Sequence, residues 1–567
     1  MPERTPFLIN KAFKKYLWAS LLTVAATQIA NIVDAAIVGN LIGDEGLAAV
    51  NLSKPLLQTV FAITCFYVAS STILTGMAIG KGDRKAADRL FTFSVAFSVL
   101  LALLFTAAGL LCFNSLSALL CQSESLRPLA EQFMRITLYS TLPQFLMLTL
   151  NQFVTVDGNP RLVSRAVIVG NVSNIALDIL FIKYFQMGIA GAATATCVMY
   201  VISILIVLPH FFRKESLHLC KTRPGDLPLG KIFSIGLPLF LSTVLLSVQY
   251  IGNNYVASRF LGDNGLIAIA VCIQLLAFSM IILNGTLRTI QPVGSILKGL
   301  DDNLGLLMLM KRGYSFMAIC LAAYTAVLVL FPSQIGSILG VKDGGGLEMV
   351  RIAVPVFSLN IVFQCMLCCM LPAFQLFDRK GMALLLSISQ ALLPMLFFLL
   401  FRGRWTGFVT GQAVTALAIA ACGLTIHRKT PGLSRFLLIP MGDRACKLDI
   451  SVQPASASLS EAISALREFL SSNGATPHTV NVAAVCTEEF INNIIRHANA
   501  GSVDLAANLK DDGVYIMIHD DGAAFNPLET INAGGNHIGL GLTLAKEFCK
   551  DIQYKYLFNQ NMVRLKI

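Results

Sequence analysis

Long apolar stretches dominate the first three quarters of the chain. About twelve stretches of roughly 20 apolar residues each occur before residue 430, centred near residues 27, 62, 100, 142, 172, 200, 245, 280, 322, 363, 392 and 415. A helix of that length crosses a bilayer, because each residue advances the helix by about 1.5 Å. The pattern predicts an all-α polytopic membrane unit over residues 1–435, built from two six-helix halves at about 12–215 and 228–430.

The pattern changes after a basic, turn-forming segment that ends at Gly432. Period-2 alternation predicts strands at 448–452, 503–509, 514–519, 552–558 and 561–567, and helical spacing predicts helices at 459–470, 479–497 and 540–549. We therefore expect a linker at 436–446 and a soluble C-terminal α/β sandwich domain at 447–567.

The charge balance differs between the two parts. The chain of 567 residues is 55% hydrophobic and only 13% charged, with a net charge of +11. Residues from 440 onward carry a balance of −4, whereas residues 1–439 carry +15. Because the soluble domain is acidic, the composition argues against nucleic-acid binding. The basic excess lies instead between the predicted spans.

The loops between the spans alternate in their content of Lys and Arg. Basic loops include 81–89, 298–312 and 379–380, whereas the intervening loops are poor in basic residues. Since basic loops stay on the cytoplasmic side of a membrane, the alternation predicts that both chain ends are cytoplasmic.

An internal repeat relates the two predicted halves. A shift of 219 residues places Gly43 to Leu47 on Gly262 to Leu266 and Asp34 on Asn253, and a shift of 218 places Asp83 on Asp301. Six spans separate the copies, so both halves are expected to have the same orientation, related by an axis along the membrane normal.

The first half resembles the multidrug and toxin extrusion (MATE) transporters. The resemblance is carried by the stretch from Asn31 to Gly39, by Gly43 and the following Leu47 to Val50, by Gly76 to Asp83 and by Asn174 to Asp178. It covers roughly residues 12–430 and implies a multi-pass exporter in the plasma membrane of a bacterium. Many members carry a proline in the first span, and this chain has none between Lys11 and Leu41, so a proline-centred bend is not expected here.

Charged and amide side chains inside the predicted spans are candidates for transport, because they are costly in a bilayer. Asp34 matches the aspartate that, by the MATE resemblance, couples transport to H⁺ or Na⁺; the alternative is a neutral structural group. Asp178 is the second carboxylate, with coupling and structural roles both open. Arg288 either contacts a charged partner or extends toward the interface. Asn253 and Asn254 either bind substrate or join helices.

Three motifs in the C-terminal domain predict a nucleotide site. Glu489 and Asn493 share one face of a predicted helix and suit general-base and Mg²⁺-ligand chemistry. Asp520, followed by Gly522, comes directly after a predicted strand, where a carboxylate accepts from an adenine amino group. A glycine-rich segment that includes Gly539 and Gly541 runs into a helix N-terminus, which favours phosphate.

The order of these motifs resembles the GHKL ATPases, and within them the anti-sigma-factor serine kinases. The resemblance implies that Glu489 is the catalytic base, Asn493 the Mg²⁺ ligand and Asp520 the adenine contact, with ATP and Mg²⁺ as cofactors. Gly539 and Gly541 would form the phosphate loop. The activity implied is that of a protein serine/threonine kinase or ATPase, with a STAS-type or sigma-factor protein as partner. His497 is not interpreted as a phosphoacceptor.

Together the two parts predict a cation-coupled exporter of small amphipathic or cationic compounds with a cytosolic, serine-kinase-like ATP-binding domain that regulates it. Two alternatives stay open. One is a flippase for lipid-linked saccharides, because that superfamily shares the architecture. The other is a membrane-anchored anti-sigma-type kinase in which the membrane part is a sensor.

Overall fold

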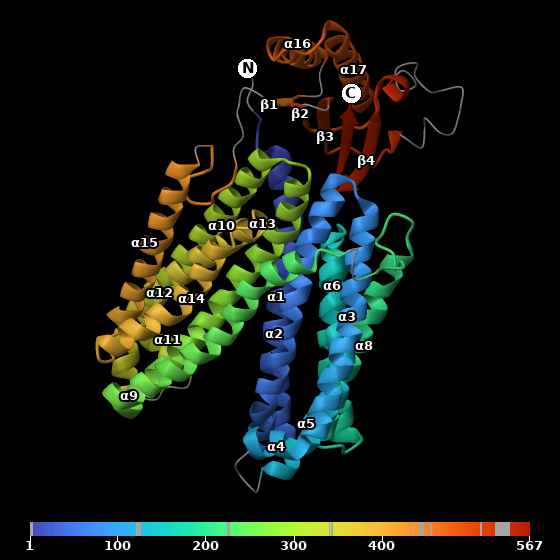
Figure 1. Ribbon diagram of the computed structural model, residues 1–567. Helices are drawn as coiled ribbons and strands as arrows, with labels where there is room; N and C mark the ends of the chain where they lie inside the picture. The colour runs from blue at the N-terminus through green and yellow to red at the C-terminus, as the bar shows by residue number, and fades with distance from the viewer. Residues whose placement is uncertain are drawn as a thin grey trace.

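The computed structural model shows two bundles of membrane-length helices with a small α/β domain at one end (Figure 1). We call this end the domain end. The structure describes residues 4–120, 126–223, 227–339, 341, 344–430, 432–440, 447–453, 456–510, 513–527 and 545–567. The bundles lie close together at the domain end and diverge toward the opposite end.

The first half comprises the helices up to α8 and a short turn after it. Their bounds are α1 (Phe7–Leu41), α2 (Asp44–Lys81), α3 (Arg84–Leu111), α4 (Phe113–Leu120), α5 (Arg127–Tyr139), α6 (Thr141–Val156), α7 (Pro160–Ile179), the π-helix η1 (Leu180–Tyr184), α8 (Ile189–Val207) and the 3₁₀-helix η2 (Leu208–Phe212).

The second half begins with α9 and ends with α15. Its helices are α9 (Leu229–Gly299), α10 (Asn303–Leu330), α11 (Pro332–Ile338), α12 (Gly345–Cys368), α13 (Leu371–Leu376), α14 (Lys380–Leu400) and α15 (Thr406–Lys429). In the described residues, 10 helical stretches are long and apolar enough to cross a membrane. Two more spans arise because the 71-residue α9 changes direction at Gly262 and because α5 and α6 follow each other directly. The predicted polytopic, two-half fold is therefore correct.

Corresponding turns in the two halves adopt the same backbone conformation. Gly43 and Gly262, 219 residues apart, both have positive φ (98° and 64°). Gly82 and Asp301 also have positive φ (85° and 63°), and each is followed by an aspartate that caps the next helix. The aspartate that corresponds to Asp83 is therefore Asp302, and the shift of 218 expected for this pair is wrong by one residue. Asp301 occupies a left-handed position that glycine fills in the first copy.

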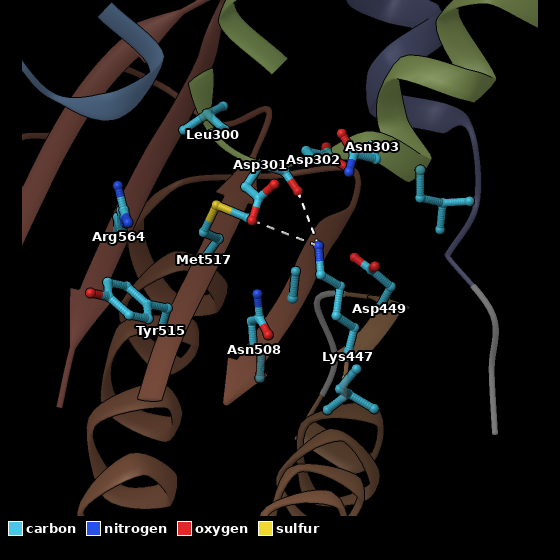
Figure 2. A pocket seen from close by; sticks show the side chains of 14 residues that line it. Leu300, Asp301, Asp302, Asn303, Lys447, Asp449, Asn508, Tyr515, Met517 and Arg564 are labelled. Atoms are coloured by element: carbon cyan, nitrogen blue, oxygen red, sulfur yellow. Dashed lines mark hydrogen bonds and ion pairs between the residues drawn. The ribbon is translucent and has the colours of Figure 1, made fainter. Parts of the chain in front are cut away.

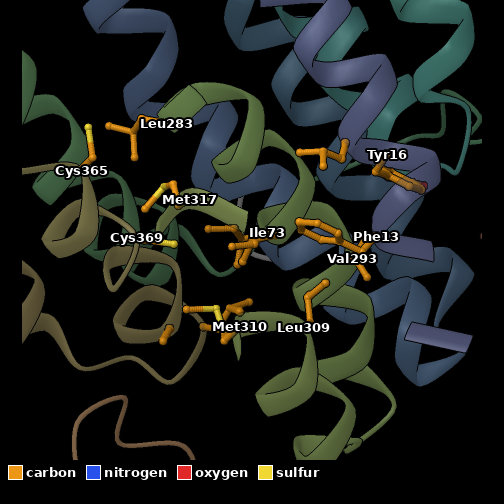
Figure 3. Packing of buried hydrophobic residues seen from close by; sticks show 14 of the residues in the cluster. Phe13, Tyr16, Ile73, Leu283, Val293, Leu309, Met310, Met317, Cys365 and Cys369 are labelled. Atoms are coloured by element: carbon orange, nitrogen blue, oxygen red, sulfur yellow. The ribbon is translucent and has the colours of Figure 1, made fainter. Parts of the chain in front are cut away.

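The two halves touch most closely where α2 and α9 meet at the domain end. A methyl group added to Gly80 would lie 2.7 Å from the Cα atom of Gly299, so only glycine permits this approach. Around the contact, a single apolar cluster combines Phe13 of α1 and Ile73 of α2 with Val293 of α9 (Figure 3). The halves are thus joined by direct backbone and side-chain packing at this end.

In its described residues, the C-terminal domain is a five-stranded antiparallel sheet with two long helices and a short helical segment at 545–548, where the predicted helix at 540–549 lies partly outside the described residues. Its strands are β1 (Lys447–Val452), β2 (Val503–Lys510), β3 (Gly513–Asp520), β4 (Asp551–Leu557) and β5 (Gln560–Lys566), in the order β1-β2-β3-β5-β4; its helices are α16 (Ser456–Ser472) and α17 (Pro477–His497). Alternate residues of each strand pack under the helices, such as Ile450 of β1 and Ile516 of β3. The opposite face of the sheet points toward the membrane bundles.

The Gly80–Gly299 contact predicts a position-specific cost. We expect Gly80→Ala to lower the unfolding temperature of the detergent-solubilised protein, because the added methyl group overlaps the α9 backbone; overpacking of this kind costs about 1–3 kcal/mol. Gly381→Ala is the matched control, since nothing lies within 4 Å of a methyl group there. Equal unfolding temperatures for the two variants would contradict the close approach of α2 and α9.

Candidate functional site: a carboxylate pair in the membrane and a nucleotide pocket

Two carboxyl groups meet inside the first half. Asp34 lies on α1 and Asp178 on α7, and these helices pack against each other. The Asp178 side chain is fully buried, and its carboxyl group interacts with that of Asp34. Asp34 itself is half-buried. Because neighbouring carboxylates repel each other and Asp178 is removed from water, a proton or a bound cation would stabilise the pair.

Polar groups that the sequence analysis did not single out for transport surround this pair. Tyr200 of α8 is buried and interacts with Asp34. Asn174 is buried one helical turn before Asp178, and its Nδ2 atom has no hydrogen-bond partner among the described residues. Asn174 lies four residues before Asp178, and this spacing on one helix face could be recognised in the sequence. Tyr200 reaches the site only through the packing of α8.

The other predicted transport residues lie on α9, in the second half. Asn253 of α9 is buried, with its Oδ1 atom unpartnered among the described residues, whereas Asn254 is exposed. Arg288, also on α9, is partly buried near Cys65 of α2, and no ion pair between Arg288 and a described residue is present. The structure therefore joins Asp34 with Asp178 but joins neither of them to Arg288.

In the C-terminal domain, α17 carries the predicted catalytic residues. This helix packs against β3. Glu489 and Asn493 are partly buried on it, whereas the neighbouring Glu488 is exposed. The Nδ2 atom of Asn493 is buried and has no hydrogen-bond partner among the described residues. Its amide is thus a polar group that a ligand would satisfy.

Asp520 is the last residue of β3, and the loop after it lies against the C-terminal end of α17. The Asp520 side chain is 1% exposed, and its Oδ1 atom accepts hydrogen bonds from the Gly522 amide (2.8 Å) and from Nδ2 of Asn561 (2.8 Å). Burial raises the pKa of the Asp520 carboxyl. A side chain at Gly522 would collide with the carbonyl oxygen of Ala498, the residue that ends α17. Asn493 precedes Ala498 by about 7.5 Å along the helix.

Asn561 at the start of β5 is a site residue that sequence reasoning did not assign. Its Nδ2 atom donates to Asp520, and its Oδ1 atom accepts from the Tyr554 hydroxyl (2.8 Å) and the Phe525 amide (3.2 Å). Asn561 therefore fixes the orientation of the Asp520 carboxyl and of the loop after it. The strand pairing of β3 with β5 places Asn561 opposite Asp520, which the sequence alone did not reveal.

The neighbouring Asp521 connects this loop to the membrane part. Its carboxylate accepts from Nζ of Lys11 on α1 (2.7 Å) and from the amides of Gly501 and Ser502. Partial burial opposes ionisation, but these donors outweigh it and lower the pKa of the Asp521 carboxyl. The loop after β3 is therefore in direct contact with α1, the helix that carries Asp34.

Part of the predicted phosphate site lies outside the described residues. Gly539 and Gly541 belong to the segment 528–544, and the side chain of His497 is likewise outside the described part. Of the described residues, Glu489 and Asn493 lie on α17, Asp520 ends β3, and Gly522 in the following loop approaches Ala498 at the end of α17. Their chemistry fits a bound ATP with Mg²⁺: an orphaned amide, a carboxylate for the adenine amino group and a second carboxylate on the helix.

Two family matches divide the chain in the same way as the fold. Residues 19–180 match the MatE family, and residues 452–567 match the histidine kinase-like ATPase domain family. The multidrug export protein MepA of Staphylococcus aureus is 23% identical over 298 residues, which cover 51% of this chain and 64% of that protein. MepA of Staphylococcus saprophyticus is 24% identical over 281 residues, which cover 48% of this chain and 60% of that protein. The chain thus spans less than two thirds of these relatives.

Solved transporter structures share the fold of the membrane part. An outward-facing multidrug resistance transporter of the MATE family superposes with a TM-score of 0.65 at 21% identity, over 72% of this chain and 93% of that chain. A MOP superfamily transporter from Pyrococcus furiosus gives a TM-score of 0.64 at 22% identity, over the same shares. The protein is therefore a multi-pass membrane protein of MATE-type fold that carries a MatE domain at residues 19–180 and a histidine kinase-like ATPase domain at residues 452–567.

Proposed function

We propose that this protein is a cation-coupled antiporter that exports small amphipathic or cationic compounds and that its C-terminal domain binds ATP and regulates it. The observation that carries the proposal is the interaction of the half-buried Asp34 with the buried Asp178. An antiporter needs a membrane group that binds its coupling ion, H⁺ or Na⁺, in one state and releases it in another. Two carboxyl groups in contact are suited to this, because adding or removing one positive charge changes their mutual repulsion.

The proposed orientation places the domain end in the cytoplasm of a bacterial cell. The loops at this end include the basic segments at 81–89 and 298–312, and cytoplasmic loops are enriched in Lys and Arg. The ATP-binding domain would then face the cellular nucleotide pool. Asn253, Asn254 and Arg288 stay candidates for substrate contact.

In the C-terminal domain, ATP with Mg²⁺ would be held by residues from α17 and the loop after β3. Asn493 would ligate the Mg²⁺ ion through its amide oxygen, and Glu489 would accept a proton from an attacking hydroxyl or water. Asp520 accepts its described hydrogen bonds through Oδ1, so its Oδ2 atom is the acceptor we assign to the adenine amino group. Bound Mg²⁺ would neutralise phosphate charge during transfer. Gly539 and Gly541 complete the proposed phosphate loop.

The reaction of this domain is proposed as phosphoryl transfer to a serine or threonine, with a STAS-type or sigma-factor protein as the acceptor or binding partner. Hydrolysis by water is the alternative, because Glu489 would serve both nucleophiles in the same way. No described feature favours the flippase or the sensor hypothesis over the antiporter.

Replacing Asp34 tests the coupling proposal. We expect Asp34→Asn to reduce gradient-driven efflux of a cationic dye from reconstituted vesicles at least tenfold, because the amide neither binds a proton nor supplies a negative charge for Na⁺. The assay applies H⁺ and Na⁺ gradients separately and thereby identifies the coupling ion.

Asp263→Asn is the control, since Asp263 is an exposed carboxylate on α9. It should transport like the wild type. Unchanged efflux by Asp34→Asn would refute its role in coupling.

Replacing Asn493 tests the nucleotide site. We expect Asn493→Ala to weaken binding of Mg-ATP to the full-length protein about tenfold, which corresponds to about 1.4 kcal/mol for the loss of one charge-assisted contact. Fluorescent ATP binding in the presence and absence of Mg²⁺ measures this effect, and phosphate release shows whether ATP is hydrolysed.

Asn492→Ala is the matched control, because it removes the neighbouring amide from a different face of the same helix. Its affinity should stay that of the wild type. If both variants lose affinity equally, the effect comes from α17 as a whole and the assignment of Asn493 fails.

A further inference from the structure

One face of the C-terminal sheet lies against both membrane halves. The side chains of β3 alternate, so Ile516 and Ile518 pack under the helices while Met517 and His519 point to the other face. That second face meets Gly80 of α2 and Leu300 after α9. The sheet therefore covers the junction at which α2 and α9 approach each other.

The contact with the second half is built around a buried arginine. Arg4, which precedes α1, is 6% exposed, and its guanidinium binds Asp302 of the α9–α10 turn at 2.8 Å and Asp504 of β2 at 2.9 Å. A third carboxylate, Asp449 of β1, lies 3.6 Å away. Burial opposes ionisation of Asp302, but Arg4 and the Gly305 amide outweigh it, so the pKa of the Asp302 carboxyl is lowered. This arginine thus links the N-terminal segment, the second half and the sheet.

A second link crosses the same boundary beside Arg4. Lys447 of β1 donates to the carbonyl oxygen of Asp301 at 3.3 Å, and its Nζ atom lies 3.9 Å from the Asp301 carboxylate (Figure 2). In this view Lys447 and Asp449 reach from the sheet toward the turn that holds Asp301 and Asp302. The second half is therefore held at the turn between α9 and α10.

The contact with the first half uses the turn between β4 and β5. Phe558 packs edge to face on Tyr16 of α1, with ring centroids 5.5 Å apart. Asn559 accepts from Lys15 at 2.8 Å, and Gln560 donates to the Leu8 carbonyl at 2.7 Å. The Lys11–Asp521 ion pair adds a fourth contact on α1. The sheet is thus bound to both halves at once. Ion pairs hold it to the second half, and the packing of Phe558 on Tyr16, two hydrogen bonds and one ion pair hold it to the first half.

Alternating access requires the two halves to separate at the domain end, and the Gly80–Gly299 contact holds this end closed. Separation would move α1 and the α9–α10 turn apart. Because Arg4 directly precedes α1, either its ion pair with Asp302 would break or the sheet would lose its contact with one of the two membrane halves. Either change uncovers buried charge, which is unfavourable unless the partners are replaced.

We propose that the ATP-binding domain is a clamp that holds the transporter closed on the cytoplasmic side, with Arg4 as the residue that locks the two halves together. The proposal rests on the proposed antiport function, which requires the two halves to open the ion site to each side of the membrane in turn. In this proposal, the face of the sheet that is not covered by α16 and α17 binds the membrane part of the same chain. A protein partner of the domain would then bind elsewhere on it or compete with the clamp.

Double electron–electron resonance on the full-length protein in nanodiscs tests the clamp. Spin labels are introduced as non-canonical amino acids at the exposed positions Lys85 of α3 and Lys311 of α10, which belong to different halves and lie outside the clamp contacts. We expect one short distance in the wild type. Arg4→Gln should add a longer-distance population of at least a fifth of the molecules, because the lock between α1 and Asp302 is lost.

Asp302→Asn is the second variant. It removes the charge that Arg4 needs but keeps an oxygen that accepts from the Gly305 amide and so caps α10. Arg467→Gln on the exposed surface of α16 is the matched control and should leave the distance unchanged. ATP binding shows that each variant is folded.

Wild-type distances in both Arg4→Gln and Asp302→Asn would overturn the clamp. Failure of the proposed function gives a different result, because wild-type vesicles would then show no gradient-driven efflux while the two clamp variants still shift the distance. Loss of folding by Arg4→Gln alone leaves Asp302→Asn to decide.

Discussion

A charge in surroundings of low dielectric constant needs a compensating partner, and this constraint places the residues on which the molecule depends. In the membrane part it explains why the Asp34–Asp178 pair is informative: two carboxyl groups in contact are tolerated only with a proton or a cation between them. At the domain end it explains why the Arg4 guanidinium is surrounded by carboxylates from both the membrane part and the sheet.

The way the C-terminal domain is attached distinguishes it from a domain held only by a linker. Its α16–α17 face has its own apolar core, whereas the opposite face contributes Leu557, Phe558 and Met562 to the cluster of the membrane helices. The loop after β3 also touches α1 through Asp521 and Lys11. Asp520, the proposed adenine contact, is thus followed directly by Asp521, the residue that binds α1, the helix that carries Asp34.

The repeat shows how the same architecture is kept with different residues. Gly43 and Gly262 are equivalent positions with positive φ, and both are glycine. At the second pair of equivalent positive-φ positions, the first half has Gly82 and the second half has Asp301. The sequence pattern suggested Asp301 as the counterpart of Asp83 because both are aspartates. The backbone shows that the capping residue is Asp302, since it is the carboxylate that accepts from the Gly305 amide. The same Oδ1 atom of Asp302 also accepts a hydrogen bond from Arg4.

Local patterns in the sequence determined the membrane spans and the described strands and long helices of the C-terminal domain, and they indicated Asp34, Asp178, Asn493 and Asp520 as candidate residues. Hydrophobic length and periodicity act over a few tens of residues, so they can be read without the fold. Only the tertiary structure decided that Asp178 meets Asp34, that Asn561 orients Asp520, and that Arg4 binds Asp504 across 500 positions of the chain. Such contacts depend on how separate elements pack, and no local pattern specifies which distant partner compensates a buried charge.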